Sequence, residues 1–279
     1  MADQNPPNYE SYLKLAELLT LQRPLAKPES HDELQFIIVH QTYELWFKLL
    51  THEIKAVMKA LEEKNLSQVI WLMKRCNEIT RVLNQQIQIM ETMSPMVFLE
   101  FRDLLNPASG LQSYQFRALE FMSGLKNERY LNLYAPSSLG HQTLLEALEK
   151  PSLWDTFVTY LKTQGFSTES EKDQLESLKQ IYQDAQWNMI HFLCEAFVEY
   201  DEAFRVWRHR HFLMAERMIG FKPGTGHHEA QKVGDQPLPS TASGESFKDA
   251  GVHYLKSRTE PRYFPLLWEL RTILARPKL

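Results

Sequence analysis

Two long runs of helical periodicity constrain the fold of this 279-residue chain more than any other feature. Across residues 32–61, apolar side chains recur every three or four positions for about eight turns, at positions 36, 39, 43, 46, 47, 50, 54, 57, 58 and 61. Residues 66–93 repeat this period. A strand would alternate with a period of two, and the sequence contains no such alternation. The sequence therefore predicts an all-α fold, a helical bundle built on long helices.

Capping residues and prolines divide the remaining chain into further helices, about ten in all. Ser94-Pro95 has the N-cap and first-turn residues that begin a helix, and Gly220 is typical of the residue that ends one. We expect one long helical tract between about residue 168 and Gly220. Because no linker rich in proline, glycine and serine interrupts the chain before residue 223, we expect residues 1–279 to form a single domain.

The segment 227–249 differs from the rest of the chain in composition. It is rich in glycine, proline and serine and has few large apolar side chains, so it cannot bury enough surface to offset the entropy of ordering. We expect a mobile surface loop there, inserted into the domain. The adjacent pair His227-His228 could bind a metal, but without a carboxylate or cysteine at ligand spacing we favour a solvated loop.

Charge and cysteine content exclude several classes of partner. The formal net charge is −4, with 43% hydrophobic and 24% charged residues, so the chain has no basic field for nucleic acid or an anionic membrane surface. No run of about 18 apolar residues could span a membrane. Cys76 and Cys194 are far apart, and the N-terminus lacks the apolar core of a secretion signal. These features predict a cytoplasmic protein without a disulfide framework or a cysteine-rich zinc site.

One histidine lies inside an apolar stripe near the end of the last long helix. His209 is about 200° around the helix from His211 and lies among charged residues. The neighbours of His211 at helical period are instead large and apolar, namely Phe204, Trp207, Met214 and Met218. A neutral imidazole with one free lone pair suits an axial ligand of a metal or a haem. The alternative is a core histidine whose N–H is satisfied by a backbone carbonyl.

A second histidine lies in similar surroundings on the first long helix. His40 shares one helix face with the aromatic residues Phe36, Tyr43 and Phe47. This pattern again allows two interpretations, a site histidine or a satisfied core histidine.

An arginine on the helix that begins at Pro95 is the third candidate. Arg102 is four residues after Phe98, so the two share a face, and its other neighbours are also apolar. A guanidinium in such surroundings needs an anion, and its fork matches a carboxylate. The anion is either the carboxylate of a ligand or, within the chain, Asp103.

Three separated blocks of sequence then occur in a specific order. They are Phe36-Ile37-Ile38-Val39-His40-Gln41-Thr42 with Glu44-Leu45-Trp46; Phe101-Arg102-Asp103-Leu104 with Pro107-Ala108-Ser109-Gly110-Leu111-Gln112-Ser113; and Trp207-Arg208 to His211 with Ile219-Gly220 and Lys222-Pro223-Gly224-Thr225-Gly226. Together these blocks resemble the tryptophan 2,3-dioxygenase family. The resemblance extends from about Tyr9 to Arg271.

The resemblance implies a haem-dependent dioxygenase. In this family a non-covalent haem b, ferrous in the active form, lies between helices and is held by the histidine that matches His211. The absence of a Cys-x-x-Cys-His motif agrees with a haem that is not covalently attached. The implied reaction uses O2 to cleave the indole C2–C3 bond of L-tryptophan. The product is N-formyl-L-kynurenine, in the first step of tryptophan degradation by the kynurenine pathway.

The resemblance also implies roles for individual residues. His40 matches the distal histidine that forms a hydrogen bond with the indole N–H, and Phe36 matches an aromatic wall of the indole pocket. Arg102 matches the residue that binds the substrate carboxylate. Thr225 matches the hydroxyl at the carboxylate and ammonium end of the substrate. The remaining matches are Phe98 at the substrate and Ser109 and Gly110 in the loop that lines substrate and haem edge.

The N-terminal residues match a segment that lies in a neighbouring subunit in this family. The matching side chains are Tyr9, Tyr12 and Leu13, which would complete the substrate pocket of that subunit. The resemblance therefore implies a homotetramer in which residues 1–30 are exchanged between subunits.

The sequence departs from the family pattern at two places. Phe98 stands where some bacterial members have a tyrosine. After Gly226 the family has a Gly-Ser-Ser-Gly run, whereas this chain has His227-His228-Glu229-Ala230 and an apparent insertion before residue 251. Two alternative functions are a haem-dependent monooxygenase of an indole or related aromatic amino acid, and a non-catalytic haem sensor or carrier. Arg102 argues against the carrier, because a carrier needs no residue that binds a substrate carboxylate.

Overall fold

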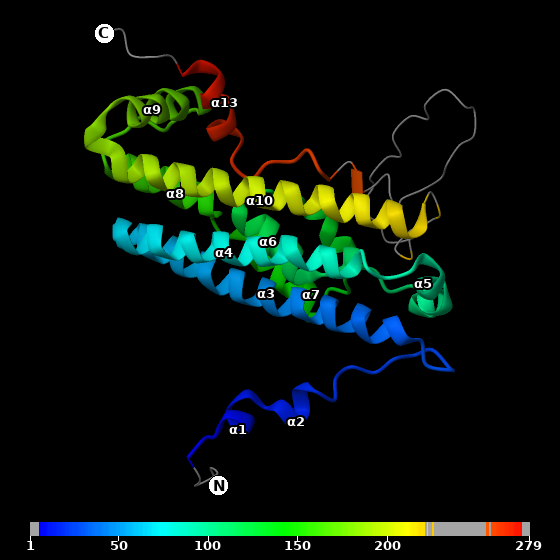
Figure 1. Ribbon diagram of the computed structural model, residues 1–279. Coiled ribbons are helices and arrows are strands. Elements are labelled where there is room, and N and C mark those ends of the chain that lie inside the picture. Colours follow the sequence, from blue (N-terminus) through cyan, green and yellow to red (C-terminus); the bar gives the residue numbers. More distant parts are fainter. Residues whose placement is uncertain (1–5, 221, 223–224, 226–254, 257, 275–279) are drawn as a thin grey trace, which may run out of the picture.

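The computed structural model describes residues 6–220, 222, 225, 255–256 and 258–274. These residues form helices and connecting turns without a β-strand among them, which confirms the predicted all-α fold. The three longest helices are α3 (His31–Glu62), α4 (Leu66–Met90) and α10 (Asn188–Ile219). They run side by side along the length of the molecule (Figure 1). The expected insertion at 227–249 lies outside the described residues.

The shorter helices pack around these three. On the side of α3, the packed helices are α6 (Tyr114–Ser123), α7 (Leu139–Glu149) and α8 (Leu153–Thr163). Helices α9 (Glu171–Gln183) and α13 (Pro265–Ile273) pack together at one end of α10, and α5 (Pro95–Arg102) lies at the opposite end of the bundle (Figure 1). The 3-10 helices are η1 (Asp103–Leu105), η2 (Gly110–Gln112), η3 (Glu128–Leu133) and η4 (Ala185–Trp187).

Two predicted helix ends agree with the structure, whereas one predicted helical tract does not. Ser94 has an extended backbone and Pro95 is the first residue of α5, while Gly220 ends α10 with a φ of 58°. The single helical tract predicted before Gly220 is wrong, because Asp184 separates α9 from η4 and α10. The Asp184 side chain accepts a hydrogen bond of 3.0 Å from the Gln186 amide. Such a local bond competes with helical hydrogen bonding and ends the helix.

The core lies where α3, α4 and α10 meet. Leu50, Ile54 and Val57 of α3 are fully buried. Burying such a side chain contributes about 1.5–3 kcal/mol relative to leaving it exposed. Two buried amides then fix α4 against α10, because Asn77 donates to the Ala196 carbonyl and Asn84 donates to the Ala203 carbonyl. Apolar burial drives this packing, and the amides determine the alignment of the two helices.

A second, smaller apolar cluster lies near α5 and the C-terminal end of α10. Its buried members are Ala26, Val39, Ile87, Met90, Met93, Phe101, Met214 and Met218. Phe36 and Phe98 pack against it and are only partly buried. This cluster therefore places aromatic residues of α3 and α5 beside the last turns of α10.

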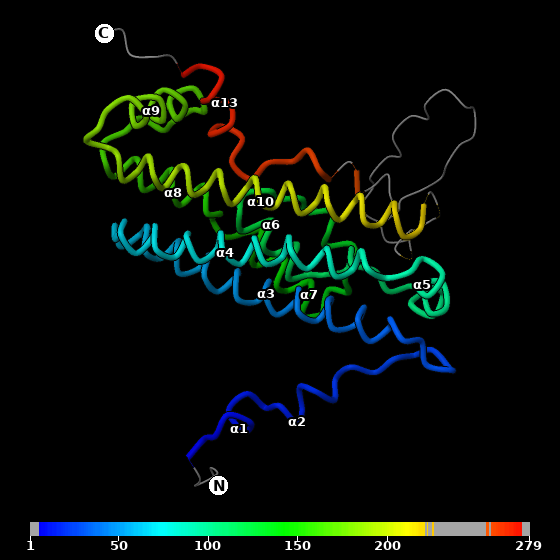
Figure 2. Tube along the Cα trace, in the orientation of Figure 1, coloured from blue at the N-terminus to red at the C-terminus, as the bar shows by residue number. Residues whose placement is uncertain are grey.

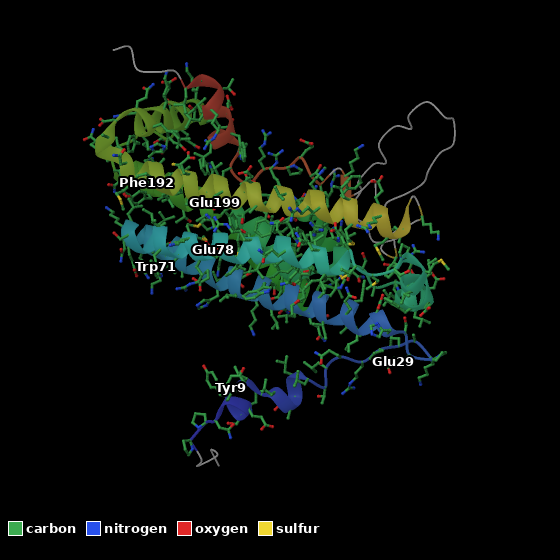
Figure 3. The ribbon with its side chains drawn as sticks, viewed as in Figure 1. Tyr9, Glu29, Trp71, Glu78, Phe192 and Glu199 are labelled. Carbon is green, nitrogen blue, oxygen red and sulfur yellow. The ribbon has the colours of Figure 1, made fainter. Side chains whose placement is uncertain are left out.

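The segment before α3 leaves the bundle as an arm. Its short helices, α1 (Tyr9–Leu13) and α2 (Leu15–Leu18), lie apart from the other helices (Figure 2). The root of the arm is held by the buried Glu33 carboxylate, which accepts from the amides of Leu25 and Ala26 at 2.7 and 3.0 Å. Tyr9 points into solvent beyond the bundle (Figure 3).

The C-terminal segment returns to α10 after the undescribed residues. The fully buried Asp201 carboxylate accepts from the Phe264 amide at 3.2 Å and from the Trp268 indole N–H at 2.9 Å. This contact holds α13 and the preceding residues on the bundle. Among the described helices, none combines the length and apolar composition required to cross a membrane.

Candidate functional site

A cavity opens between α3, α6, α10 and the loop that contains η2. Its empty space, including the open mouth, is about 1360 Å³. Aromatic and aliphatic side chains form much of its wall, and its polar lining includes two histidines and three arginines. The lining residues discussed below are His40, Glu44, Ser109, Gly110, Arg117, Glu120, Trp207, Arg208, His211, Thr225 and Arg258.

His211 lines this cavity from α10, whereas His209 on the same helix is exposed. The Trp207 ring is parallel to the His211 ring, with 5.5 Å between ring centroids. Burial lowers the pKa of His211 to about 4, and positive charge at His40 and Arg117 acts in the same direction. His211 is therefore neutral near pH 7 and has a free lone pair for a metal.

The alternative explanation for His211 required a backbone carbonyl as partner. Among the described residues, no carbonyl accepts a hydrogen bond from the His211 ring. A half-buried histidine without such a bond is expected to have another use for its nitrogens. The geometry therefore favours a ligand histidine over a satisfied core histidine.

His40 faces the same cavity from α3. Its Nδ1 is 2.7 Å from the Phe36 carbonyl oxygen. Because a carbonyl can only accept, Nδ1 carries the proton and Nε2 of the neutral ring is an acceptor. Burial lowers the pKa of His40, and the hydrogen bond to Phe36 and the charge of Glu44 oppose this shift. His40 is exposed to solvent, but it lines the cavity, where many protein atoms surround the ring and partly exclude water from it.

The predicted substrate residues on α5, Phe98 and Arg102, are not among the residues that line the cavity, and Phe36 lies between His40 and Phe98. The Phe36 ring centroid is 4.1 Å from that of His40 and 5.8 Å from that of Phe98. Arg102 follows Phe98 by one turn, and 14% of its side chain is exposed. Phe36 and Phe98 therefore form an aromatic surface that connects His40 with α5.

The expected intrachain partner of Arg102 makes only a weak contact. The Arg102 Nη1 is 3.8 Å from the Asp103 Oδ1, and 85% of the Asp103 side chain is exposed. This distance is too long for a hydrogen bond, and an exposed ion pair contributes about 0–1 kcal/mol. The pair with Asp103 therefore contributes little to the stability of the fold.

Ser109 and Gly110 lie at the edge of the cavity, in a tightly turned loop. The Ser109 hydroxyl accepts from the Leu111 amide at 3.2 Å, and the Gln112 side chain accepts from the Ser109 amide at 3.1 Å. A Cβ atom added to Gly110 would meet nothing within 4 Å. The capping box therefore stabilises the loop, and the space next to Gly110 is open.

Thr225 also lines the cavity, but the other residues of its glycine-rich block are only partly described. The altered residues His227-His228-Glu229-Ala230 lie outside the described residues. Tyr9, Tyr12 and Leu13 do not approach the cavity of their own chain, and 76%, 77% and 41% of them are exposed. They are free to contact another molecule.

The sequence did not reveal the most highly charged part of the cavity wall. Glu120 forms ion pairs with Arg117 and Arg208, at 2.5 and 3.5 Å, and lies near Arg258. Burial opposes ionisation of Glu120, but Arg117, Arg258 and Arg208 together hold its pKa below the ordinary value. The one local signal was the three-residue spacing of Arg117 and Glu120, since the other partners are distant in sequence.

Glu44 is a second lining carboxylate that the sequence did not single out. It lies one turn after His40 on α3, and the Gln115 side chain donates to its Oε2 at 2.8 Å and to its backbone carbonyl at 3.0 Å. Glu44 is thus held beside His40 by a residue of α6.

These features define an all-α protein whose cavity is lined by two neutral histidines from two different helices. Within the described ranges, no group of three or more side-chain ligands could hold a metal ion. A single neutral imidazole, stacked on Trp207 in an aromatic wall, instead fits a metal that is carried by a planar macrocycle.

Comparisons with known proteins agree with this class. The family model for tryptophan 2,3-dioxygenase matches residues 2–173. The tryptophan 2,3-dioxygenase of Nocardioides sp. is 41% identical over 272 residues, which cover 95% of this chain and 94% of the relative. Those of Serratia proteamaculans and Herpetosiphon aurantiacus are 36% and 38% identical, and each alignment covers 95% of this chain and at least 92% of the relative. The chain belongs to the tryptophan 2,3-dioxygenase family, whose members are haem-dependent oxidoreductases.

Proposed function

We propose that this protein uses O2 to cleave the indole C2–C3 bond of L-tryptophan and releases N-formyl-L-kynurenine. Family membership supports the reaction. The observation that carries the assignment of the site is the pair His40 and His211, both neutral and both facing one cavity from different helices. The proposed product is the first intermediate of tryptophan degradation by the kynurenine pathway.

The residues of the cavity fit haem b. The free lone pair of His211 would hold the iron, Trp207 would support the imidazole, and Ser109 and Gly110 would border the macrocycle. When bound in its ferrous form, the haem supplies the centre at which O2 is activated. The protein supplies a neutral ligand and a largely apolar wall, and it shields the reaction from water.

His40 is proposed to orient the indole ring. Its Nε2 is an acceptor because Nδ1 donates to the Phe36 carbonyl, so it can accept the indole N–H. Phe36 and Phe98 would pack against the ring, since they continue the aromatic surface from His40 towards α5. One hydrogen bond and two aromatic contacts then determine which edge of the indole faces the cavity.

The amino-acid end of the substrate is proposed to lie between α5 and Thr225. The Arg102 guanidinium would form a bidentate pair with the carboxylate, and the Thr225 hydroxyl would contact the carboxylate and ammonium groups. A carboxylate bound at this point would fix the distance between the amino-acid end and the indole that His40 orients.

We also propose a cytoplasmic homotetramer in which residues 1–30 are exchanged between subunits. The exposed arm residues Tyr9, Tyr12 and Leu13 support this assembly, because they carry apolar surface that their own chain leaves uncovered. They would complete the pocket of a neighbouring subunit. Both cysteines are buried and unpaired, which suits a reducing compartment.

Product analysis tests the proposed reaction against its alternatives. The haem protein is reduced without oxygen, mixed with L-tryptophan and exposed to ¹⁸O2, and the product is identified by its near-ultraviolet absorbance and its mass. The proposed reaction incorporates both labelled atoms into N-formylkynurenine. A monooxygenase would incorporate one labelled atom into the organic product, and a haem sensor or carrier would form no product.

Replacing His40 with serine is expected to slow turnover by about tenfold, because one hydrogen bond to the indole is lost. The haem spectrum and the affinity for L-tryptophan should change little. The measurement compares kcat for L-tryptophan and 1-methyl-L-tryptophan, which lacks the indole N–H. The ratio between the two substrates should shrink in His40→Ser. The control is His31→Ser, whose imidazole is 99% exposed on the same helix; an equal loss in both variants would contradict this role.

Activity is expected to fall in acid at a pH below 6.5, the ordinary pKa of histidine. His40 acts in its neutral form, so activity is lost as the pH falls through its pKa, and burial lowers that pKa. Glu44 raises the same pKa, so Glu44→Gln should move the acid limb of kcat/KM to still lower pH. The amide retains an acceptor for Gln115. Glu62 is exposed on the same helix, so Glu62→Gln is the control. An unchanged acid limb in Glu44→Gln, or an equal shift in Glu62→Gln, would contradict the assignment of this limb to His40.

A further inference from the structure

A charged cluster forms one part of the cavity wall and has no assigned role in the proposed reaction. It consists of Arg117 and Glu120 of α6, Arg208 of α10 and Arg258 of the C-terminal segment, and all four line the cavity. Only 7%, 1% and 4% of the side chains of Arg117, Glu120 and Arg208 are exposed. Charges buried to this extent are costly unless several charged or polar groups stabilise them.

The contacts within the cluster join three parts of the chain. Glu120 bridges α6 and α10 through its ion pairs with Arg117 and Arg208. Arg208 also donates to the Pro261 carbonyl at 2.6 Å, and its guanidinium lies 5.2 Å from the centre of the Tyr263 ring. The Arg258 guanidinium lies over the Tyr130 ring, as does that of Arg117. The arginines are therefore held in fixed positions before any ligand arrives.

The charge of the cluster selects an anion. Its four side chains carry three positive charges and one negative charge, and all four line the cavity. The other lining carboxylate, Glu44, lies on α3 and is held by Gln115. In addition, the buried Nε of Arg208 has no hydrogen-bond partner among the described residues. A guanidinium fork with a remaining donor matches a carboxylate.

The cluster also has a defined position relative to His211. Arg208 precedes His211 by one turn of α10, and both side chains face the cavity. A ligand whose carboxylate binds to the cluster would therefore lie in the same cavity as the His211 imidazole. The arginine proposed for the substrate carboxylate, Arg102, is on α5 and does not line this cavity. The cluster and Arg102 are therefore two separate places at which a carboxylate could bind.

We propose that Arg117, Arg208 and Arg258 bind the carboxylate groups of the haem, and that Arg258 closes this end of the cavity from the C-terminal segment. The proposal rests on the proposed binding of haem at His211. It makes haem retention depend on a segment distant in sequence from the ligand helix, because Arg258 and the Pro261 carbonyl reach the cluster from beyond residue 254.

The first test uses the ligand. The apoprotein is reconstituted with haem b or with its dimethyl ester, in which both carboxylates are neutral, and the rate of haem transfer to excess apomyoglobin is measured. We expect the ester to dissociate at least about tenfold faster, because charge-assisted bonds to arginine are lost. If wild-type protein binds no haem b, the proposed haem function fails. If it holds haem b and the ester equally well, only the carboxylate site fails.

The second test uses matched variants of the C-terminal segment. Arg258→Gln should accelerate dissociation of haem b by about tenfold and leave dissociation of the ester nearly unchanged, while Arg258→Lys should have an intermediate effect. Arg262→Gln is the control, since Arg262 is exposed on the same segment and stacks on Trp268. Equal effects on both haems, or equal effects of the two glutamine variants, would overturn the proposal. Weaker L-tryptophan binding in Arg258→Gln with unchanged haem dissociation would assign the cluster to the substrate and overturn it as well.

Discussion

Replacing His211 with alanine is expected to abolish stoichiometric haem binding. The variant loses the neutral imidazole that faces the cavity, and no other histidine of α10 can replace it, because His209 is exposed and His191 is more than five turns away. Haem content is measured as the ratio of haem absorbance to protein after gel filtration. The helical content measured by circular dichroism should remain, since the ring lines a cavity and does not fill the core.

His209→Ala is the matched control for this experiment. It removes the same side chain two residues away and should retain haem at the wild-type ratio. Imidazole added to His211→Ala should restore part of the haem absorbance, because the cavity left by the side chain can hold a free ligand. Equal haem content in the two alanine variants would contradict the assignment of His211 as the ligand.

Arg102→Leu is expected to weaken L-tryptophan binding by at least tenfold while the haem spectrum persists. The variant removes a charge-assisted bidentate pair, for which truncation of one partner costs about 2–5 kcal/mol when the pair is desolvated. Binding is measured by the change in the haem spectrum on titration with L-tryptophan. Tryptamine, which lacks the carboxylate, should bind both proteins with similar affinity.

Two variants separate the proposed role of Arg102 from a structural one. Asp103→Asn removes the contact at 3.8 Å and should leave the affinity for L-tryptophan unchanged. Arg129→Leu removes an exposed arginine and controls for the change in net charge. If Asp103→Asn reproduces the loss, or if Arg102→Leu binds L-tryptophan normally, Arg102 is a structural residue.

Local sequence patterns predicted the long helices and the orientation of their histidines. The period of apolar residues located α3 within one residue of its ends, and the same period distinguished His211 from His209. Both predictions depend on short-range geometry, because helical pitch determines which side chains share a face. The break at Asp184 was missed, since a side chain that ends a helix through one local hydrogen bond leaves the apolar period on both sides intact.

The family resemblance identified His40, Phe36 and Arg102 as site residues, but it could not show how they are arranged. The structure places Phe36 between His40 and Phe98 and leaves Arg102 outside the cavity lining. It also shows that Nδ1 of His40 donates to the Phe36 carbonyl, which determines the nitrogen that is available to a substrate. The sequence identifies the histidine, whereas the tautomer of its ring depends on the hydrogen-bond partner that the fold provides.

The sequence by itself determined the fold class, the helix faces and the family, because each follows from periodicity or from contiguous motifs. Only the tertiary structure revealed the cluster of Arg117, Glu120, Arg208 and Arg258, whose members come from three parts of the chain. Charges so far apart in sequence show no common pattern. They become a single site only when apolar burial packs α6, α10 and the C-terminal segment together, which removes the charges from water and strengthens their interaction.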